Sequence, residues 1–308
     1  MEQQKLTASD GTAGDSFGWS VSISGDTAIV GSFRDSDNGS ESGSAYIFVR
    51  SGTTWTEQQK LTASDGTASD WFGRSVSISG DTAIVGAHSL SAYVFVRSGT
   101  SWTQQQKLTA SDGVAVGDSF GASVSISGDT AIVGAYGDDD KGTNSGSAYV
   151  FVRSRTSWIQ QQKLTASDGT AGDSFGWSVS ISGDTAIVGS YRDSDNGSES
   201  GSAYIFVRSG TTWTEQQKLT ASDGAVDDWF GRSVSISGDT AIVAAYSGSA
   251  YVFVRSGTSW TQQQKLTASD GASSDAFGIS VSISGDTAIV GAHTDDYDHG
   301  SAYVFALP

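Results

Sequence analysis

Several short acidic loops hold oxygen-bearing side chains at a spacing that could bind a metal ion. The string Arg-Asp-Ser-Asp-Asn-Gly-Ser-Glu occurs at 34–41 and again at 192–199, while Asp-Asp-Asp-Lys-Gly lies at 138–142 and Asp-Asp-Tyr-Asp at 295–298. Alternating aspartates followed by glycine can wrap a hard cation such as Ca²⁺, which takes six to eight oxygen ligands. The predicted metal ligands are Asp35, Asp37, Glu41, Asp138, Asp140, Asp193, Asp195, Glu199, Asp295 and Asp298.

Asp10 and Asp15, and their equivalents Asp168 and Asp173, stand in a second loop that could complete the shell of such an ion. The alternative is that all of these loops are simply solvated, with aspartate and asparagine side chains bonding to their own turns. Both interpretations are open at this point.

An aromatic ring, a cation and a carboxylate stand close together at two places. Asp-Trp-Phe-Gly-Arg occurs at 70–74 and at 228–232, beside shortened neutral loops. Such a set could stack on and hydrogen-bond a sugar or a protein side chain. Alternatively, the tryptophans fill the space left by the short loops and the arginines pair with a nearby aspartate. The predicted ligand-binding residues are Trp71, Arg74, Trp229 and Arg232, with Trp19 and Trp177 at the repeat position of Arg74.

Catalytic constellations are poorly represented. The chain has no cysteine, and His88, His293 and His299 are scattered, so neither a thiolate metal site nor a Ser-His-Asp set is predicted. Carboxylate pairs abound, but their repetition makes each one less diagnostic of a hydrolase. We therefore expect a protein that is not an enzyme.

Charge narrows the possible partners. The formal net charge is −17 and the isoelectric point is about 4.3. Such a surface repels phosphate backbones, so we expect no nucleic acid, whereas cations, basic proteins and neutral ligands suit it. No apolar run reaches about 18 residues, so no membrane span is predicted. No signal peptide is visible in the chain.

The acidic and aromatic loops lie at equivalent places in a block of about fifty residues that is repeated six times. The copies cover 2–56, 57–103, 104–159, 160–214, 215–261 and 262–308. Each copy is too short to bury its own core, so neighbouring copies must supply one another's interior. Copy four matches copy one at 53 of 55 positions, so a three-copy unit is written twice and like copies are expected to lie opposite each other.

Each copy carries four strand signals and no helical periodicity. In the first copy they are 20–24, 27–30, 44–49 and 54–61, which we call strands a, b, c and d. Four antiparallel strands per repeat are typical of a propeller blade. The sequence predicts an all-β, six-bladed propeller over 1–308 as a single domain. The d–a and b–c loops should lie on one face, and the a–b and c–d turns on the other.

The chain ends predict how the propeller closes. Residues 2–8 read as a d strand without a preceding c strand, and the last copy stops after its c strand. The N-terminal strand is therefore expected to complete the sixth blade, which removes an exposed sheet edge.

A Phe-Gly dipeptide and, after strand b, a Gly-Ala-like pair mark every repeat, as at Phe72-Gly73 and Gly86-Ala87. With the surrounding LTASDG and SISGD strings they resemble FG-GAP repeats of the bacterial type, which are similar to the propeller of integrin α subunits. The resemblance implies an extracellular or cell-surface adhesion or ligand-binding module. One departure matters: Ser24-Gly25-Asp26-Thr27 replaces the DxDxDG calcium loop of integrin-type copies, so those calcium sites are not carried over.

We therefore expect a non-catalytic, extracellular binding or adhesion propeller that takes a protein or glycan ligand and binds Ca²⁺ through its acidic loops. One alternative is a self-assembling module, since acidic loops on one face would oppose arginines near the c–d turns on the other, unless the Ser-Gly-Asp-Thr aspartates neutralise them. The other alternative is a glycan-binding lectin that uses the tryptophan and arginine pairs. The arginines in question are Arg50, Arg97, Arg153, Arg208 and Arg255.

Overall fold

The structure is a computed structural model that describes residues 3–88, 90–113, 115, 117–271, 275–295 and 300–307. Backbone contacts divide the chain into two compact units. Unit 1 comprises Met1–Val133 with Val150–Gln160, and unit 2 comprises Gly134–Tyr149 with Gln161–Pro308. Each unit is described by itself, and the single domain expected over 1–308 stays a prediction.

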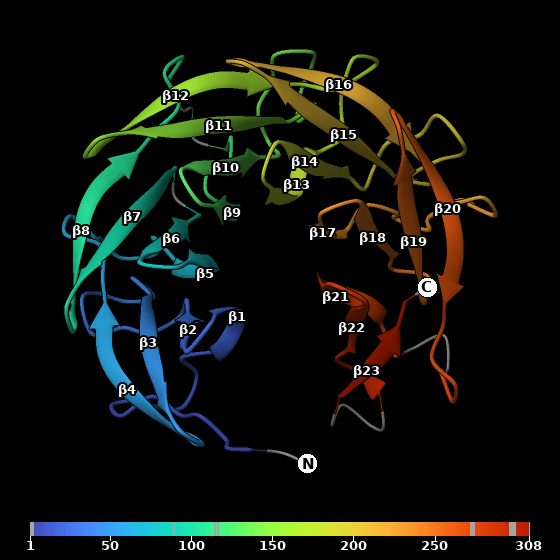
Figure 1. The fold of residues 1–308 in the computed structure, drawn as a ribbon. Helices are drawn as coiled ribbons and strands as arrows, with labels where there is room; N and C mark the ends of the chain where they lie inside the picture. Colours follow the sequence, from blue (N-terminus) through green and yellow to red (C-terminus); the bar gives the residue numbers. More distant parts are fainter. Residues whose placement is uncertain are drawn as a thin grey trace. The chain divides into compact units, whose positions relative to one another are not determined.

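Six antiparallel sheets, one per repeat, make up the described chain (Figure 1). We call them blades one to six. Blade one consists of β1 (Phe17–Ser24), β2 (Thr27–Ser32), β3 (Ser44–Ser51) and β4 (Thr54–Leu61). Blade two consists of β5 (Phe72–Ser79), β6 (Thr82–Ala87), β7 (Ser91–Ser98) and β8 (Ser101–Leu108). Blade three consists of β9 (Ser123–Ser127), β10 (Thr130–Ala135), β11 (Ser147–Ser154) and β12 (Ser157–Leu164).

The remaining blades repeat the same order. Blade four consists of β13 (Phe175–Ser182), β14 (Thr185–Ser190), β15 (Ser202–Ser209) and β16 (Thr212–Leu219). Blade five consists of β17 (Ser233–Ser237), β18 (Thr240–Ala245), β19 (Ser249–Ser256) and β20 (Ser259–Leu266). Blade six consists of β21 (Phe277–Ser284), β22 (Thr287–Ala292) and β23 (Ser301–Ala306).

The predicted fold class is confirmed: the protein is an all-β, six-bladed propeller with strands paired in chain order within each blade. Strand a is longer than predicted in four blades, because it begins at the Phe of Phe-Gly, as at Phe17. The register shifts between Phe17 and Ser20, so a bulge joins the extra residues to the predicted strand. A bulge of this kind is hard to see in a pattern of alternating residues.

Neighbouring repeats do supply one another's core. Ile29 and Ile47 of blade one pack in one buried cluster with Phe72, Val76 and Ile78 of blade two. The same cluster forms in unit 2 from blades four and five. Strands b and c are therefore apolar on both faces, since each face meets a different neighbour.

Side chains satisfy the edges of the blades. Strand a has no sheet partner beyond it, and serine hydroxyls of the preceding blade accept its free N–H groups, as Ser22 does from Ile78 at 3.1 Å and Ser24 from Gly80 at 3.0 Å. At the other edge the Gln59 amide accepts a hydrogen bond from the backbone N–H of Trp102 and donates one to its carbonyl, both at 2.7 Å. The alternating serines and the repeated glutamines are thus connectors between blades.

Blade six has three strands in the described residues, consistent with a fourth strand supplied by the N-terminal segment. That segment makes the contact of a d strand within unit 1: the Gln4 amide bonds to the backbone of Trp55 at 2.8 Å in both directions, as Gln59 bonds to Trp102. The pairing of residues 2–8 with β23 stays a prediction.

Blades approach most closely at two glycines. A Cβ on Gly31 of blade one would overlap the carbonyl oxygen of Gly73 in blade two, and in unit 2 a Cβ on Gly189 would overlap that of Gly231. Blade five departs from this pattern because Ala244 replaces the first glycine. Its methyl group is fully buried in the cluster that joins blades five and six, so the fold accommodates a side chain at this place.

This contrast predicts that two small substitutions change the free energy of unfolding by different amounts. Gly189→Ala should lower the free energy of unfolding by about 1–3 kcal/mol, because the new methyl group overlaps backbone that cannot rotate away. Ala244→Gly is the matched control and should change stability by less than about 1 kcal/mol. Urea denaturation measures both, and equal losses in the two variants would contradict the close approach.

Candidate functional site

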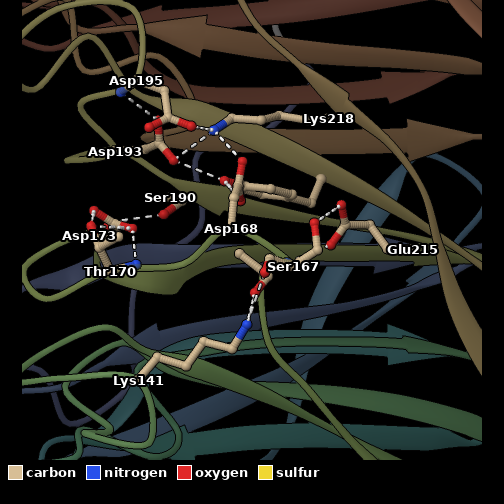
Figure 2. Close-up of polar contacts among 12 residues, drawn as sticks. Lys141, Ser167, Asp168, Thr170, Asp173, Ser190, Asp193, Asp195, Glu215 and Lys218 are labelled. Atoms are coloured by element: carbon tan, nitrogen blue, oxygen red, sulfur yellow. Dashed lines mark hydrogen bonds and ion pairs between the residues drawn. The ribbon is translucent and has the colours of Figure 1, made fainter.

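A lysine ammonium lies among the aspartates that the sequence proposed as metal ligands. In blade four, Lys218 Nζ is 2.8 Å from Asp168, 2.9 Å from Asp193 and 2.7 Å from Asp195 (Figure 2). The Tyr204 hydroxyl lies 2.9 Å from Asp168 and 2.8 Å from Asp193, and its single proton can be donated to one of them at a time. The d–a loop, the b–c loop and strands c and d each contribute, which confirms that these two loops lie together.

Blade one repeats this arrangement. Lys60 Nζ is 2.8 Å from Asp10, 2.9 Å from Asp35 and 2.5 Å from Asp37, and Tyr46 lies 2.8 Å and 2.7 Å from the first two. In both blades the three carboxylates offer oxygens within 4.8 Å of one another, so the cluster could hold a metal ion. We call these two groups the lysine–aspartate clusters.

In blade one the Lys60 ammonium favours the ionised forms of Asp10 and Asp35. The hydrogen bond from Lys60 keeps the pKa of Asp10 below its usual value. Burial works against ionisation of Asp35, but hydrogen bonds from Lys60 and the Asp37 backbone outweigh it and lower the pKa of that carboxyl. Burial likewise disfavours charge on Lys60, yet its aspartate partners raise the pKa of the ammonium. The cluster is therefore a network of ion pairs at neutral pH.

The other blades carry smaller versions. In blade three, Lys163 lies 2.9 Å from Asp138 and 2.5 Å from Asp140, and Tyr149 donates to Asp138 at 2.9 Å. Blades two and five keep one aspartate each: Lys107 pairs with Asp65, and Lys265 pairs with Asp223, both at 2.6 Å.

In blade six the Tyr303 hydroxyl lies 2.8 Å from both Asp270 and Asp295. Asp298, also predicted as a ligand, lies outside the described residues.

Four of the other proposed oxygen donors lie apart from the clusters. Asp15 accepts hydrogen bonds from the backbone and hydroxyl of Thr12, and Asp173 does the same with Thr170, so these two carboxylates cap their own turns. The two glutamates instead accept the indole N–H of a neighbouring tryptophan. The pairs are Trp71 with Glu41 at 3.0 Å and Trp229 with Glu199 at 2.9 Å.

The six proposed ligand-binding residues fall into two clusters, one in each unit. In unit 1, the Arg74 guanidinium lies 5.8 Å from the Trp19 ring, 5.9 Å from Phe33 and 5.7 Å from Trp71. The rings also touch each other, and His88 extends the row at 5.2 Å from Trp71. Burial, with Arg74 nearby, lowers the pKa of His88 to about 4, so this ring is neutral at pH 7.

Unit 2 encloses its arginine more fully. The Arg232 guanidinium lies 5.4 Å from Trp177, 5.7 Å from Tyr191, 5.6 Å from Trp229 and 5.2 Å from Tyr246. Distances of this size are within the range of cation–π attraction. We call the two groups the aromatic–arginine clusters.

Arg232 has an unusual electrostatic environment. Burial lowers the pKa of its guanidinium, and its Nε is buried without a hydrogen-bond acceptor among the described residues. The expected alternative, pairing with a neighbouring aspartate, is not observed for Arg232 in the described part of the chain.

Trp71 and Trp229 also hold the backbone in a left-handed conformation, with φ of 53° and 52°. Ser16 and Ser174 occupy the same place in blades one and four, with φ of 58° and 57°. The fold therefore requires this backbone conformation in each blade but does not require a tryptophan there. Bulky side chains rarely adopt a positive φ.

The arginines near the c–d turns are neutralised locally. Arg50 pairs with Asp26 at 2.6 Å and Arg97 with Asp81 at 2.6 Å, and the other three pair in the same way with Asp129, Asp184 and Asp239. The Ser-Gly-Asp-Thr aspartates thus join the a–b and c–d turns. Head-to-tail stacking stays a prediction, but this pairing removes the free positive charge on which it was based.

The six repeats match a known family of repeated sequences. A model of the FG-GAP repeat matches residues 1–48, 55–98, 102–151, 158–206, 213–253 and 260–305. The chain belongs to the FG-GAP repeat family. A search of curated proteins found no match. Among the described residues of this FG-GAP protein, no helix has the length and apolarity needed to cross a membrane.

Sequence reasoning missed the lysines, the tyrosines and the rings that complete the two kinds of cluster. Lys60 and Tyr46 recur in every repeat beside a recurring aspartate, which was the available signal. Phe33 and Tyr191 directly follow strand b, at a repeat position that holds a ring in every copy. The other copies carry His88, Tyr136, Tyr246 and His293 there, and this recurrence was the available signal.

The lysine–aspartate clusters predict a graded loss of stability. Replacing both Lys60 and Lys218 with Met should lower the free energy of unfolding by ~2–3 kcal/mol per blade, because Asp35, only 2% exposed, loses its counter-charge. Lys107→Met is the matched control: its single partner Asp65 is half-exposed, and the loss should stay below about 1 kcal/mol. Urea denaturation at pH 7 gives both values.

The same measurement against pH checks the cause. The aspartate pKa values are lowered in the folded state, so their stabilisation is present above about pH 4 and is lost as pH falls through the folded values. The raised lysine pKa makes its contribution present below about pH 10 and lost at higher pH. The deficit of the double variant should therefore shrink in acid, and a deficit independent of pH would disprove the electrostatic explanation.

Proposed function

We propose that this FG-GAP propeller is a non-catalytic binding or adhesion module that works outside the cell and holds its ligand at the aromatic–arginine clusters. The observation that supports this most directly is convergence. Six side chains singled out from sequence come together as two like sets, Trp19–Trp71–Arg74 and Trp177–Trp229–Arg232. The family is commonly a binding module and is typical of extracellular proteins.

The exposure of the clusters favours binding over pure packing. Tyr246 is 37% exposed, and Trp71, Trp177 and Trp229 are half-buried. The strand-d tryptophans, by contrast, are almost fully buried, as at Trp102, Trp158 and Trp213. Packing tryptophans of this fold are thus found at one repeat position, and the cluster tryptophans lie at others. Exposed aromatic rings beside an arginine are the usual composition of interaction hot spots.

Contacts within the clusters support a partly structural role as well. Trp71, which precedes blade two, donates a hydrogen bond to Glu41 and contacts Phe33, and both of these residues belong to blade one. These contacts fix the position of its ring. Anchoring of this kind preorganises a binding surface, because the rings need not be ordered when a ligand arrives.

The repeats supply a substitution that tests binding without disturbing the backbone. Trp71→Ser together with Trp229→Ser installs the residue that blades one and four already use at this φ, so the thermal midpoint should change little. Binding should weaken at least about tenfold, since one stacked aromatic is worth ~1 kcal/mol or more at a hot spot. The probes are a glycan array and immobilised acidic and basic peptides.

Ile159→Ser is the matched control, because Ile159 is an exposed apolar side chain, 58% accessible, that belongs to neither cluster. A double serine variant that melts early but binds every probe as the parent does would show that the tryptophans serve only the fold.

We propose weak Ca²⁺ binding at the lysine–aspartate clusters as a second candidate function. The donor set fits a hard cation in type, since three carboxylates converge within 4.8 Å. The Lys60 ammonium lies among the same oxygens, so Ca²⁺ would have to displace it. Calcium affinity should therefore be low, and the lysine should be what limits it.

Calorimetry with Ca²⁺ separates these contributions. Neutralising Asp35, Asp37, Asp193 and Asp195 as asparagines should abolish any calcium heat and thermal shift of the parent. Lys60→Met with Lys218→Met should raise the affinity, because three carboxylates are left without a cation. If neither the parent nor the lysine variant takes up Ca²⁺ at millimolar concentration, the calcium proposal is wrong.

A further inference from the structure

Arg232 is a cation for which the described residues supply no hydrogen-bond acceptor, in a chain that is rich in carboxylates. The sequence has 34 acidic residues against 17 lysines and arginines, and the turn arginines such as Arg50 and Arg208 each find an aspartate. Arg232 finds four aromatic rings instead, and its Nε is buried with no partner among the described residues. A guanidinium has five N–H donors, and leaving them unmet in a desolvated site is costly.

The surrounding rings determine which N–H groups of Arg232 can bind a ligand. Rings that stack on a guanidinium leave its edge free for hydrogen bonds. Nε of Arg232 is buried, so the two terminal NH2 groups are the part of that edge that a ligand could reach. That edge matches the two oxygens of a carboxylate, which can accept two parallel hydrogen bonds. No described carboxylate of the chain takes this place, although Glu199 is close enough to bond to Trp229 and lies 3.8 Å from Arg192.

We propose that Arg232 recognises the carboxylate of an acidic sugar, a uronic-acid-type residue at the end of a glycan, whose ring packs on the exposed face of Tyr246. This inference rests on the proposed function, because it names the ligand class of the same cluster. The carboxylate accepts hydrogen bonds from the terminal NH2 groups of the guanidinium. The flat C–H face of a pyranose is the usual partner of an exposed aromatic ring such as that of Tyr246.

Charge and shape favour a single sugar carboxylate over a long polyanion or an acidic peptide. The protein carries a net charge of −17, so an extended polyanion is repelled along its whole length. One carboxylate at the end of a glycan feels mainly the local cation, since distant charges are screened beyond about 8 Å at physiological salt. Trp177, Trp229 and Tyr246, which are only partly buried, also present more ring surface than a short aspartate or glutamate chain can cover.

The unit 1 cluster provides an internal comparison. His88 occupies the place of Tyr246, and Arg74 lies near three rings rather than four. If a ring at this place supports the sugar, unit 2 should contribute most of the affinity.

Titration calorimetry on the full chain tests the proposal with three probes: an oligosaccharide ending in glucuronic acid, the same oligosaccharide with that carboxyl reduced to the alcohol, and a short glutamate peptide. The parent should bind the acid at least about tenfold more tightly than the reduced sugar, as expected for a charge-assisted pair of hydrogen bonds. Arg232→Gln should erase this preference while the weaker affinity for the neutral sugar remains.

Two further variants keep the result interpretable. Arg155→Gln removes an exposed arginine outside both clusters and should bind as the parent does. Arg232→Lys keeps the charge but loses the planar fork, so it should retain less than a tenth of the preference if the fork is what recognises the carboxylate. Thermal midpoints of all variants are measured alongside, and the comparison of acid with reduced sugar on the parent decides the matter if Arg232→Gln does not fold.

The outcomes are distinguishable from failure of the proposed function. Equal affinity of the parent for the acid and reduced sugars would overturn carboxylate recognition and leave a binding module that uses its aromatic rings alone. Preference for the glutamate peptide would overturn the sugar as the ligand class. Absence of binding to all three probes would also overturn the inference. The proposed binding function would then be tested separately, by the glycan array and the immobilised peptides used with the double serine variant.

Discussion

Two backbones meet at glycine between blades one and two, two and three, and four and five, and the other contacts between these blades depend on that closeness. Gly31 faces the carbonyl oxygen of Gly73, at a distance that leaves no room for a side chain. Only at such separation can Ser22 reach the N–H of Ile78 and the Gln59 amide span to the backbone of Trp102. The Phe-Gly and Gly-Ala dipeptides of this family are thus the two halves of one contact.

The same contact builds the aromatic–arginine clusters. Phe33 follows Gly31 by two residues and Trp71 precedes Gly73 by two, so the approach of the glycines brings the two rings to 5.9 Å. Tyr191 and Trp229 stand in the same relation to Gly189 and Gly231, and their rings also lie 5.9 Å apart. The left-handed backbone of Trp71 adds strain of about 1–2 kcal/mol, which the neighbouring ring contacts can offset.

Much of this arrangement was predictable from sequence, because a sixfold repeat shows which positions the fold requires. The six blades, the pairing of the d–a and b–c loops and the turn role of Asp26 all followed from that reasoning. The convergence of the aspartates was expected, but the cation among them was not, since Lys60 and Tyr46 were not singled out as site residues. Their partners come from three separate segments, and only the folded backbone shows that one ammonium meets all three carboxylates.

The charge pairing distinguishes the cations that stabilise the fold from Arg232, which has no carboxylate partner among the described residues. A chain with twice as many acidic as basic side chains can neutralise nearly every cation internally, and Lys60, Lys218 and the turn arginines are neutralised in this way. Arg232, which is enclosed in rings, has no such salt bridge among the described residues, although the chain has 34 acidic residues. A packing role would be met as well by an apolar residue, such as the Ile279 that blade six carries at this repeat position. Because the fold does not require a cation there, the charge of Arg232 is best explained by a group that arrives from outside the chain.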